Sequence, residues 1–306
     1  MPRWFWPCLC LVGFQVFAAT IMRLAYPVEM DFTVFHYLGF LLAPAAFIYF
    51  VWLLGRCIEM MRDGERSPLR QIKLQVDYTY FLAILMAAIH QSAFMGVKQT
   101  LFPATGFWAD PVLASAELAL FGGDPWRLSM ALFGPFIEVI DAVYHLWFPA
   151  IAVTFAWAVF RRNDHAVTSY FLLWTLGMLA QFLLPSGGPI FFQQNGFGEQ
   201  FSGIPLGSMT HVGSVRLWLA HSQNLPDIVA GISAWPSMHV AMAVWAGLVW
   251  RHAIAWVAVS LIALGSVALG WHYVLDGVGG AVVAAMAWLA CKRPAPVAVE
   301  AARIPN

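Results

Sequence analysis

Apolar segments long enough to cross a bilayer follow one another along almost the whole chain. A membrane-spanning helix needs about 20 such residues, and inside lipid the backbone satisfies its own hydrogen bonds only in helices or closed barrels. Only 10% of the 306 residues are charged, against about 25% in an ordinary soluble domain. The sequence therefore predicts an all-α protein, a polytopic transmembrane helix bundle with about six to eight spans. The candidate spans cover roughly residues 8–26, 34–55, 76–97, 138–160, 166–185, 236–252, 253–271 and 272–291.

The charges of the chain balance, and this balance excludes one class of partner. Sixteen Lys and Arg side chains oppose sixteen Asp and Glu side chains, so the formal net charge is zero. Nucleic-acid binding rests on a basic excess that neutralises phosphates, and we therefore expect no nucleic-acid partner. The four cysteines lack the pair spacing of a metal site and are expected to be reduced and inert.

The placement of Lys and Arg predicts the orientation of the bundle, because short cytoplasmic loops collect positive charge. With the amino terminus inside, twelve of the sixteen Lys and Arg residues lie on the cytoplasmic side. The two long interruptions, 98–137 and 186–235, then face the periplasm, a lumen or the exterior. We divide the chain into a two-span extension at 1–75, a core at 76–292 and a cytoplasmic tail at 293–306. A basic residue followed by an apolar segment also fits a cleavable signal peptide as the alternative for the first span.

Two polar motifs open spans near the carboxyl end. The first is WPSMH at residues 235–239, and the second is GWHYVLD at residues 270–276. His239 and His272 are 33 residues apart, which is about 50 Å of helix, or two membrane crossings of about 25 Å. The chain therefore crosses and returns, and both histidines are expected at the same non-cytoplasmic face.

The residue types in these motifs indicate phosphate chemistry. His272 and Asp276 are four residues apart and would share one helix face. A carboxylate that accepts one imidazole N–H leaves the other nitrogen as a nucleophile or base, and His239 would supply a general acid. Free N–H groups at the helix start near Ser237, and at the turn near His272, favour a phosphate group. The alternative is a structural hydrogen bond within the bundle.

The two motifs together resemble the second and third signatures of the type-2 phosphatidic acid phosphatase superfamily, P-S-G-H and S-R-x5-H-x3-D. The resemblance implies that His272 is the phosphorylated nucleophile, that Asp276 orients it and that His239 is the acid. It also implies a six-helix phosphatase-like core, no metal or other cofactor, and a site that is open to lipid.

Several departures from these signatures point to one branch of the superfamily. Met238 replaces the usual Gly, Gly265–Ser266 stands where Ser-Arg is expected, and Lys98-x6 leads to Thr105 rather than to Arg-Pro. These departures resemble the branch of inositol phosphorylceramide synthase, an inositolphosphotransferase, and the sphingomyelin synthases, which move a head group between lipids. The stretches 107–111 and 122–126 are similar to bacterial members, which implies a bacterial inner membrane.

A phosphate still needs cationic help, because charge develops on its oxygens in the transition state. The candidates on the non-cytoplasmic side are Lys98, Arg127 and Arg216, of which the two arginines rank first as loop residues. Ser237 and Gly188 are further candidates for phosphate or substrate contacts. Asp141 and His145 repeat the four-residue spacing, and a structural cluster is favoured there over an acceptor-binding patch.

These observations together predict an integral-membrane lipid phosphotransferase or phosphatase with a phosphohistidine intermediate. A phospholipid or polyprenyl phosphate would be the donor, and a lipid or polyol hydroxyl, or water, would be the acceptor. One alternative is a non-catalytic transporter or binding protein whose His and Asp groups relay protons. Another is a haem or metal protein that uses His239 and His272 as ligands.

Overall fold

The computed structural model describes residues 1–28, 34–63, 78–204, 209–225 and 231–292, and within them the chain is helical apart from its connecting loops. The prediction of an all-α bundle is therefore confirmed. The predicted domain boundary at residue 75 and the predicted tail at 293–306 lie outside the described residues. The α-helices are α1 (Phe5–Ala25), α2 (Val34–Arg62), α4 (Tyr78–Thr105), α5 (Ala109–Phe121), α6 (Pro125–Phe133), α7 (Ile137–His145), α8 (Trp147–Phe160), α9 (Asp164–Ala180), α10 (Met209–Ser222), α11 (Met238–Trp250), α12 (Ala253–Ala268) and α13 (Val274–Ala290).

The predicted spans all coincide with helices, with ends shifted by up to eight residues. Helices α5, α6 and α10 lie instead in the two stretches predicted to interrupt the spans. Four helical stretches are long and apolar enough to cross a membrane, namely Phe5–Ala25, Val34–Arg62, Tyr78–Thr105 and Pro125–Phe160. Helices α11, α12 and α13 are apolar but shorter, with 13, 16 and 17 residues. Many large apolar side chains on the outside of the bundle are exposed, as expected where lipid rather than water is the solvent.

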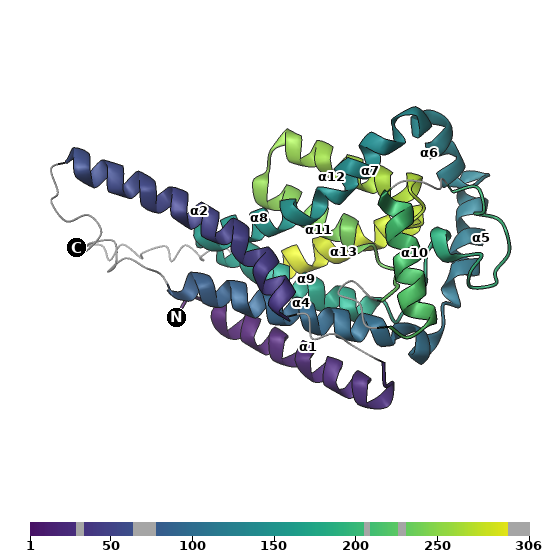
Figure 1. Cartoon of the computed structure of the whole chain (residues 1–306), viewed down its shortest axis with the longest axis horizontal. Coiled ribbons are helices and arrows are strands. Elements are labelled where there is room, and N and C mark those ends of the chain that lie inside the picture. Colours follow the sequence, from purple (N-terminus) through teal and green to yellow (C-terminus); the bar gives the residue numbers. More distant parts are fainter. Residues whose placement is uncertain (29–33, 64–77, 205–208, 226–230, 293–306) are drawn as a thin grey trace, which may run out of the picture.

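The first two helices pack directly against the rest of the bundle. Helix α1 lies along α4 and α9, and α2 lies along α4 and α8 (Figure 1). Gln15 of α1 is fully buried, and its Nε2 donates to the His90 carbonyl of α4 at 3.1 Å. The Thr175 hydroxyl of α9 donates to Gln15 Oε1 at 3.1 Å. Hydrogen bonds of this kind hold helices together inside a bilayer.

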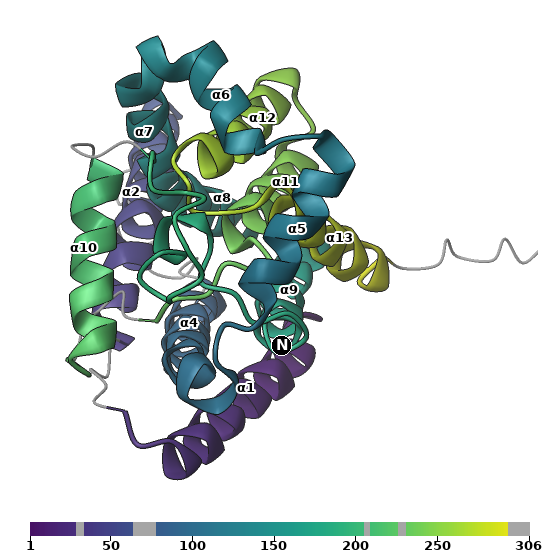
Figure 2. The same ribbon diagram turned by 90° about the vertical axis from the view of Figure 1, so that its right-hand side faces the viewer.

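Helices α5, α6 and α10 gather at one end of the molecule, away from the free end of α2 (Figure 1). When the molecule is turned to face that end, α5 and α10 flank the loop segments in front of α11 and α13 (Figure 2). Helix α13 packs against α11 and α9. The two polar motifs begin α11 and α13, so both motifs lie beneath this end of the bundle.

Candidate active site

His239 lies in the first turn of α11, which Ser237 begins. The Ser237 hydroxyl accepts a hydrogen bond from Val240 N at 3.3 Å, as an N-cap residue does. The Ser237 N–H donates to the Asp276 carbonyl at 2.9 Å, which joins the start of α11 to the first turn of α13. Ser237, which is predicted to contact phosphate, thus also sets where α11 begins.

Aromatic rings surround the imidazole of His239. The ring of Tyr144 stacks on it with centroids 4.8 Å apart, and the ring of Trp147 lies 4.4 Å away. The Trp147 indole N–H also donates to the His239 carbonyl at 2.8 Å. Packing from α7 and α8 therefore holds His239 in place while its side chain stays partly exposed.

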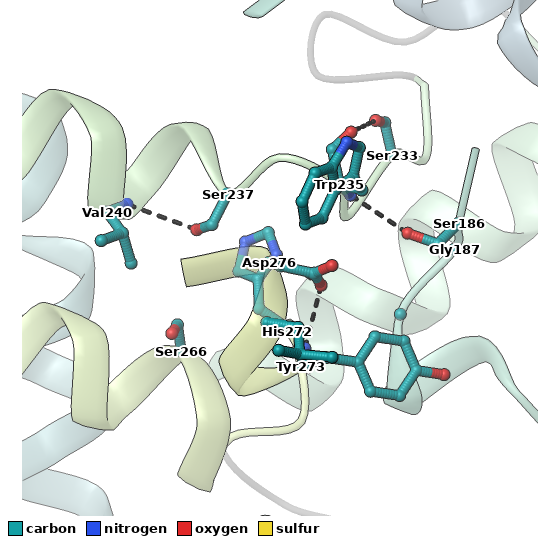
Figure 3. Close-up of polar contacts among 12 residues, drawn as sticks. Ser186, Gly187, Ser233, Trp235, Ser237, Val240, Ser266, His272, Tyr273 and Asp276 are labelled. Atoms are coloured by element: carbon teal, nitrogen blue, oxygen red, sulfur yellow. Dashed lines mark hydrogen bonds and ion pairs between the residues drawn. The ribbon is translucent and has the colours of Figure 1, made fainter. Parts of the chain in front are cut away.

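His272 differs from its predicted position, because it is not part of a helix. Helix α13 begins only at Val274, and the Tyr273 N–H donates to Asp276 Oδ2 at 2.9 Å (Figure 3). Asp276 therefore caps its own helix, with Tyr273 as the N-cap residue, and the helix begins two residues after His272. The His272 backbone is held from the other side, since its N–H donates to the Ser266 carbonyl at 3.0 Å. The expectation that His272 and Asp276 share one helix face is corrected accordingly.

The pairing of His272 with Asp276 nevertheless exists. The His272 Nδ1 atom lies 3.5 Å from Asp276 Oδ2, which is longer than the usual range for a hydrogen bond. Catalytic hydrogen bonds are often long without substrate and tighten in the complex. Both groups are buried, with 5% of His272 and none of Asp276 exposed. The carboxylate faces Nδ1, which has no hydrogen-bond partner among the described residues, and this orientation leaves Nε2 as the nitrogen for chemistry.

The two histidines meet, as the count of residues between them predicts. The centroids of the His239 and His272 rings are 5.7 Å apart. The arrangement places two imidazoles and one buried carboxylate within reach of a single small group. It can supply a nucleophile, a group that orients the nucleophile, and a proton donor. Within the described part of the chain, no group of three or more His, Cys, Asp or Glu residues could hold a metal ion.

One short loop segment, residues 186–190, contacts both histidine motifs. The Ser186 carbonyl accepts from Ala234 N at 2.8 Å, and the Ser186 hydroxyl accepts from Trp235 N at 3.1 Å (Figure 3). At its other end, Ile190 N donates to the Gly270 carbonyl at 2.8 Å. The loop segment thus joins the chain before His239 to the chain before His272.

Gly188 stands in this segment because the backbone there comes very close to Trp271. A Cβ atom on Gly188 would lie 2.4 Å from the Trp271 carbonyl oxygen, and φ is +93°. Side chains rarely tolerate either condition. The Gly188 N–H donates to Asp110 Oδ1 at 2.9 Å, so this predicted phosphate contact is already bonded to a carboxylate.

The start of α13 is likewise occupied by carboxylates. The Tyr273 N–H is bonded to Asp276, and the Leu275 N–H donates to Glu117 Oε1 of α5 at 3.0 Å. The expectation of free phosphate-binding N–H groups at the turn near His272 is therefore corrected. Two carboxyl side chains already take the place that an anion would occupy at this helix terminus.

The burial of Glu117 predicts that the stability of the fold depends on pH. Burial raises the pKa of Glu117 to about 7 from 4.5. Protonation then favours the folded state, so this contribution is complete below pH 4.5 and is lost as the pH rises through 7. Glu117→Gln keeps the acceptor for Leu275 and removes the ionisation. We expect the free energy of unfolding of the wild type to fall by about 1–3 kcal/mol between pH 5 and pH 8 because Glu117 ionises. The free energy of unfolding of the variant should fall correspondingly less. Melting temperatures of the detergent-solubilised proteins across this range check the expectation, which parallel curves would contradict.

The three predicted cationic residues lie in different surroundings. Lys98 of α4 is close enough to His239 for their charges to interact. Arg127 pairs with Asp124 at 3.0 Å, donates to the Gln200 carbonyl and covers the ring of Trp126. Arg216 lies on an exposed position of α10. Lys98 thus lies near enough to His239 for their charges to interact. The prediction that the two arginines are loop residues is wrong, because Arg127 lies in α6 and Arg216 in α10.

Asp141 and His145 belong to a structural cluster with a link to the site. Asp141 accepts two hydrogen bonds from Thr210 of α10, from the hydroxyl at 2.6 Å and from the N–H at 3.2 Å. His145 Nδ1 lies 3.2 Å from Asp141 Oδ1. The Thr210 hydroxyl accepts from the indole N–H of Trp271 at 3.1 Å. These contacts agree with the interpretation of Asp141 and His145 as a structural cluster. They also hold Trp271, the residue before His272, in place.

The sequence reasoning missed Asp110, Glu117 and Tyr273. The Tyr273 hydroxyl donates to Asp110 Oδ1 at 3.1 Å, and both acids are buried. A signal was present, because Asp110 and Glu117 are seven residues apart and therefore share one face of an otherwise apolar helix. Acidic side chains in such a helix are expected to face protein rather than lipid.

Comparison with known families matches the chain to one superfamily. The family model of the PAP2 superfamily covers residues 113–290, which is more than half of the chain and includes both histidine motifs. No curated protein and no solved structure matches the chain.

Proposed function

The chain belongs to the PAP2 superfamily, whose activities are those of phosphatases and phosphotransferases on phosphate esters, and we propose that it is an integral-membrane enzyme that transfers a phosphate or phospho-head-group from a lipid to a hydroxyl acceptor. The observation that carries this proposal is the meeting of His239 and His272, with ring centroids 5.7 Å apart, beside a buried carboxylate 3.5 Å from His272. A nucleophile, its orienting group and an acid in one place are what two-step phosphoryl transfer needs.

In the first step, Nε2 of His272 attacks the phosphorus of the donor. A P–N bond forms, the P–O bond to the donor alcohol breaks, and His239 gives its proton to the departing oxygen. Asp276 stabilises the positive charge that develops on the His272 ring. In the second step, the acceptor hydroxyl gives its proton to His239 while its oxygen attacks phosphorus. The P–N bond then breaks, and His272 is restored.

Charge on the phosphate oxygens requires a cation close to the two histidines. Lys98 is the candidate that the geometry favours, since its charge acts on His239. The N–H groups of Met238 and His239 in the first turn of α11 lack intrahelical partners, as at every helix start, and a phosphate oxygen can be bound there. Ser237 holds this first turn in place. Arg127 and Arg216 can contribute only if the helices that carry them, α6 and α10, move on binding substrate.

The chemistry of the surroundings supports a lipid donor. Large apolar side chains of α5 and α6 face outward beside the site, among them Leu118, Leu120, Phe121 and Leu128. A donor with apolar chains can therefore approach from the bilayer. Transfer rather than hydrolysis is supported by departures such as Gly265–Ser266 in place of Ser-Arg, which together resemble the branch of the inositol phosphorylceramide and sphingomyelin synthases. The distribution of Lys and Arg supports a site on the non-cytoplasmic face, and the bacterial inner membrane is the membrane we assign.

Purified protein with labelled lipids tests the proposal directly. The donors are phosphatidylinositol, phosphatidic acid and polyprenyl phosphate, each with and without diacylglycerol or ceramide as acceptor. Label in a new lipid that appears only with acceptor supports the transferase. Free phosphate without acceptor dependence shows a lipid phosphatase. Label in neither product, from wild type on every donor, contradicts the enzymatic function and favours binding or transport.

The role of His239 predicts a dependence on the leaving group. A p-nitrophenolate ion departs without a proton, whereas a lipid alkoxide needs one. His239→Ala is therefore expected to slow formation of the phosphoenzyme from a lipid phosphate by about 100-fold or more, and from p-nitrophenyl phosphate by clearly less. Rapid-mixing measurements of the first turnover compare the two donors. Equal losses with both donors would show that His239 does not act as the acid.

A further inference from the structure

Helix α5 turns its acidic residues into the protein and its apolar residues outward. Asp110 is fully buried and Glu117 is 4% exposed, whereas Val112 and Phe121 are more than half exposed. Burying a carboxylate costs several kcal/mol unless hydrogen bonds satisfy it. An apolar side chain would pack at either position at a lower cost. Two buried acids on one face of α5 therefore call for a role beyond packing.

Asp110 bonds to two segments that are far apart in the sequence. Its Oδ2 accepts from Gly187 N at 2.7 Å, and its Oδ1 accepts from Gly188 N at 2.9 Å. Oδ1 also accepts from the Tyr273 hydroxyl at 3.1 Å. The three donors leave little freedom to the carboxylate and fix the peptide planes on both sides of Gly187. Tyr273 follows His272 directly in the chain.

The loop segment that Asp110 holds is the one that joins the two histidine motifs. Ser186 bonds to Ala234 and Trp235 before His239, while Gly188 lies against the carbonyl of Trp271 before His272. A shift of Gly187 or Gly188 would therefore move both motifs. The separation of the two rings therefore depends on these peptide units as well as on the direct bond from Ser237 N to the Asp276 carbonyl.

From these contacts we propose that Asp110 is a positioning residue for phosphoryl transfer, which holds residues 186–188 and Tyr273 so that His239 and His272 stay at the distance that the reaction needs. This inference rests on the proposed function of the two histidines. Asp110 does not touch the reacting atoms. It acts through the backbone of Gly187 and Gly188 on one motif, and through the Tyr273 hydroxyl on the other.

Asp110→Asn is the variant that tests this role, because it keeps the size of the side chain. Its amide has one oxygen, and its NH2 group would face one of the two glycine N–H donors, which leaves that donor unsatisfied. We expect kcat to fall at least tenfold while KM changes less than threefold, since a misplacement of about 1 Å costs large factors in rate. Melting temperature shows whether the fold is retained.

A matched control is Asp124→Asn, in which the same substitution is made at the start of α6. Asp124 also joins separated segments, through Arg127 and Gln200, but it does not bond to either histidine motif. We expect its kcat to stay within twofold of wild type. A loss of kcat equal to that of Asp110→Asn would show a general effect of loosening loops and would overturn the inference.

A readout that needs no activity separates this inference from the proposed function. Diethyl pyrocarbonate modifies accessible imidazoles, and His272 is only 5% exposed. Mass spectrometry should show His272 modified at least fivefold faster in Asp110→Asn than in wild type. His145, with 36% of its side chain exposed, serves as the internal reference and should react equally in both proteins. If wild type transfers phosphate from no donor, the proposed function fails, and the modification rates alone decide whether Asp110 positions His272.

A second variant covers the case in which Asp110→Asn does not fold. Ser186→Ala removes only the hydroxyl that accepts from Trp235 N and leaves both glycines in place. We expect a smaller loss of kcat, about threefold to tenfold, with the melting temperature within a few degrees of wild type. Unchanged kcat together with unchanged modification of both His239 and His272 would overturn the role of the 186–190 loop segment, and with it that of Asp110.

Discussion

Replacing His272 with alanine is expected to lower phosphoryl transfer by at least about 1,000-fold, because it removes the imidazole that Asp276 faces and that we propose forms the P–N bond. Binding of the donor lipid should change little, since a nucleophile contributes mainly to the transition state. Single-turnover assays with a labelled lipid phosphate measure the loss. Wild type should also form a labelled phosphoenzyme that is stable in base and labile in acid, and the variant should form none.

His145→Ala is the matched control for this result. His145 also lies beside an aspartate four residues earlier in the chain, with its Nδ1 3.2 Å from Asp141, but its pair belongs to the structural cluster with Thr210. Its transfer activity should stay within about threefold of wild type. If His145→Ala loses as much as His272→Ala, or if His272→Ala remains active, the assignment of the nucleophile is wrong.

Gly280→Ala is expected to have the second large effect, through the packing of the two helices that carry the motifs. A Cβ atom on Gly280 would lie 2.3 Å from the Ser237 carbonyl oxygen, and that oxygen belongs to the backbone and cannot move alone. Helices α11 and α13 must separate to admit it. The bond from Ser237 N to the Asp276 carbonyl would then lengthen. We expect a loss of about 1–3 kcal/mol in stability, and a loss of activity of at least about 100-fold.

Gly277→Ala provides the comparison within the same helix. A Cβ atom at Gly277 would meet only the Val240 side chain at 3.6 Å, which is an ordinary contact. Alanine is the better helix former by about 0.5–1 kcal/mol, so this variant should be as stable as wild type or more stable, with full activity. Thermal unfolding in detergent and the transfer assay measure both variants. Similar behaviour of the two would show that the close crossing at Gly280 is not needed.

The meeting of the histidines could be predicted from the sequence because it depends on one-dimensional quantities. Two short apolar helices of known rise separate His239 from His272, and a turn between them reverses the chain. The helical state of His272 could not be predicted in the same way. Spacing alone allows a helix through both His272 and Asp276, whereas the bond from Tyr273 N to Asp276 begins the helix after His272.

The choice among the cationic residues shows a second limit of the sequence. Lys98, Arg127 and Arg216 are equivalent by charge and by predicted side of the membrane. What separates them is long-range packing. Helix α4 places Lys98 near enough to His239 for their charges to interact, and Asp124 pairs with Arg127 at the start of α6. Contacts of this kind depend on the relative placement of several helices, which no local pattern encodes.

The sequence by itself determined the helical class of this protein, its apolar surroundings and the two motifs for which we propose phosphate chemistry, because hydropathy, helix length and residue type are local properties. Only the tertiary structure decided what holds the motifs together. The carboxylates of Asp110 and Glu117 reach Gly187, Gly188 and Leu275 across a long stretch of chain, and they occupy the N–H groups that local reasoning left for phosphate. A buried carboxylate bonds to whichever donors the fold brings near it, and those donors are known only when the helices are in place.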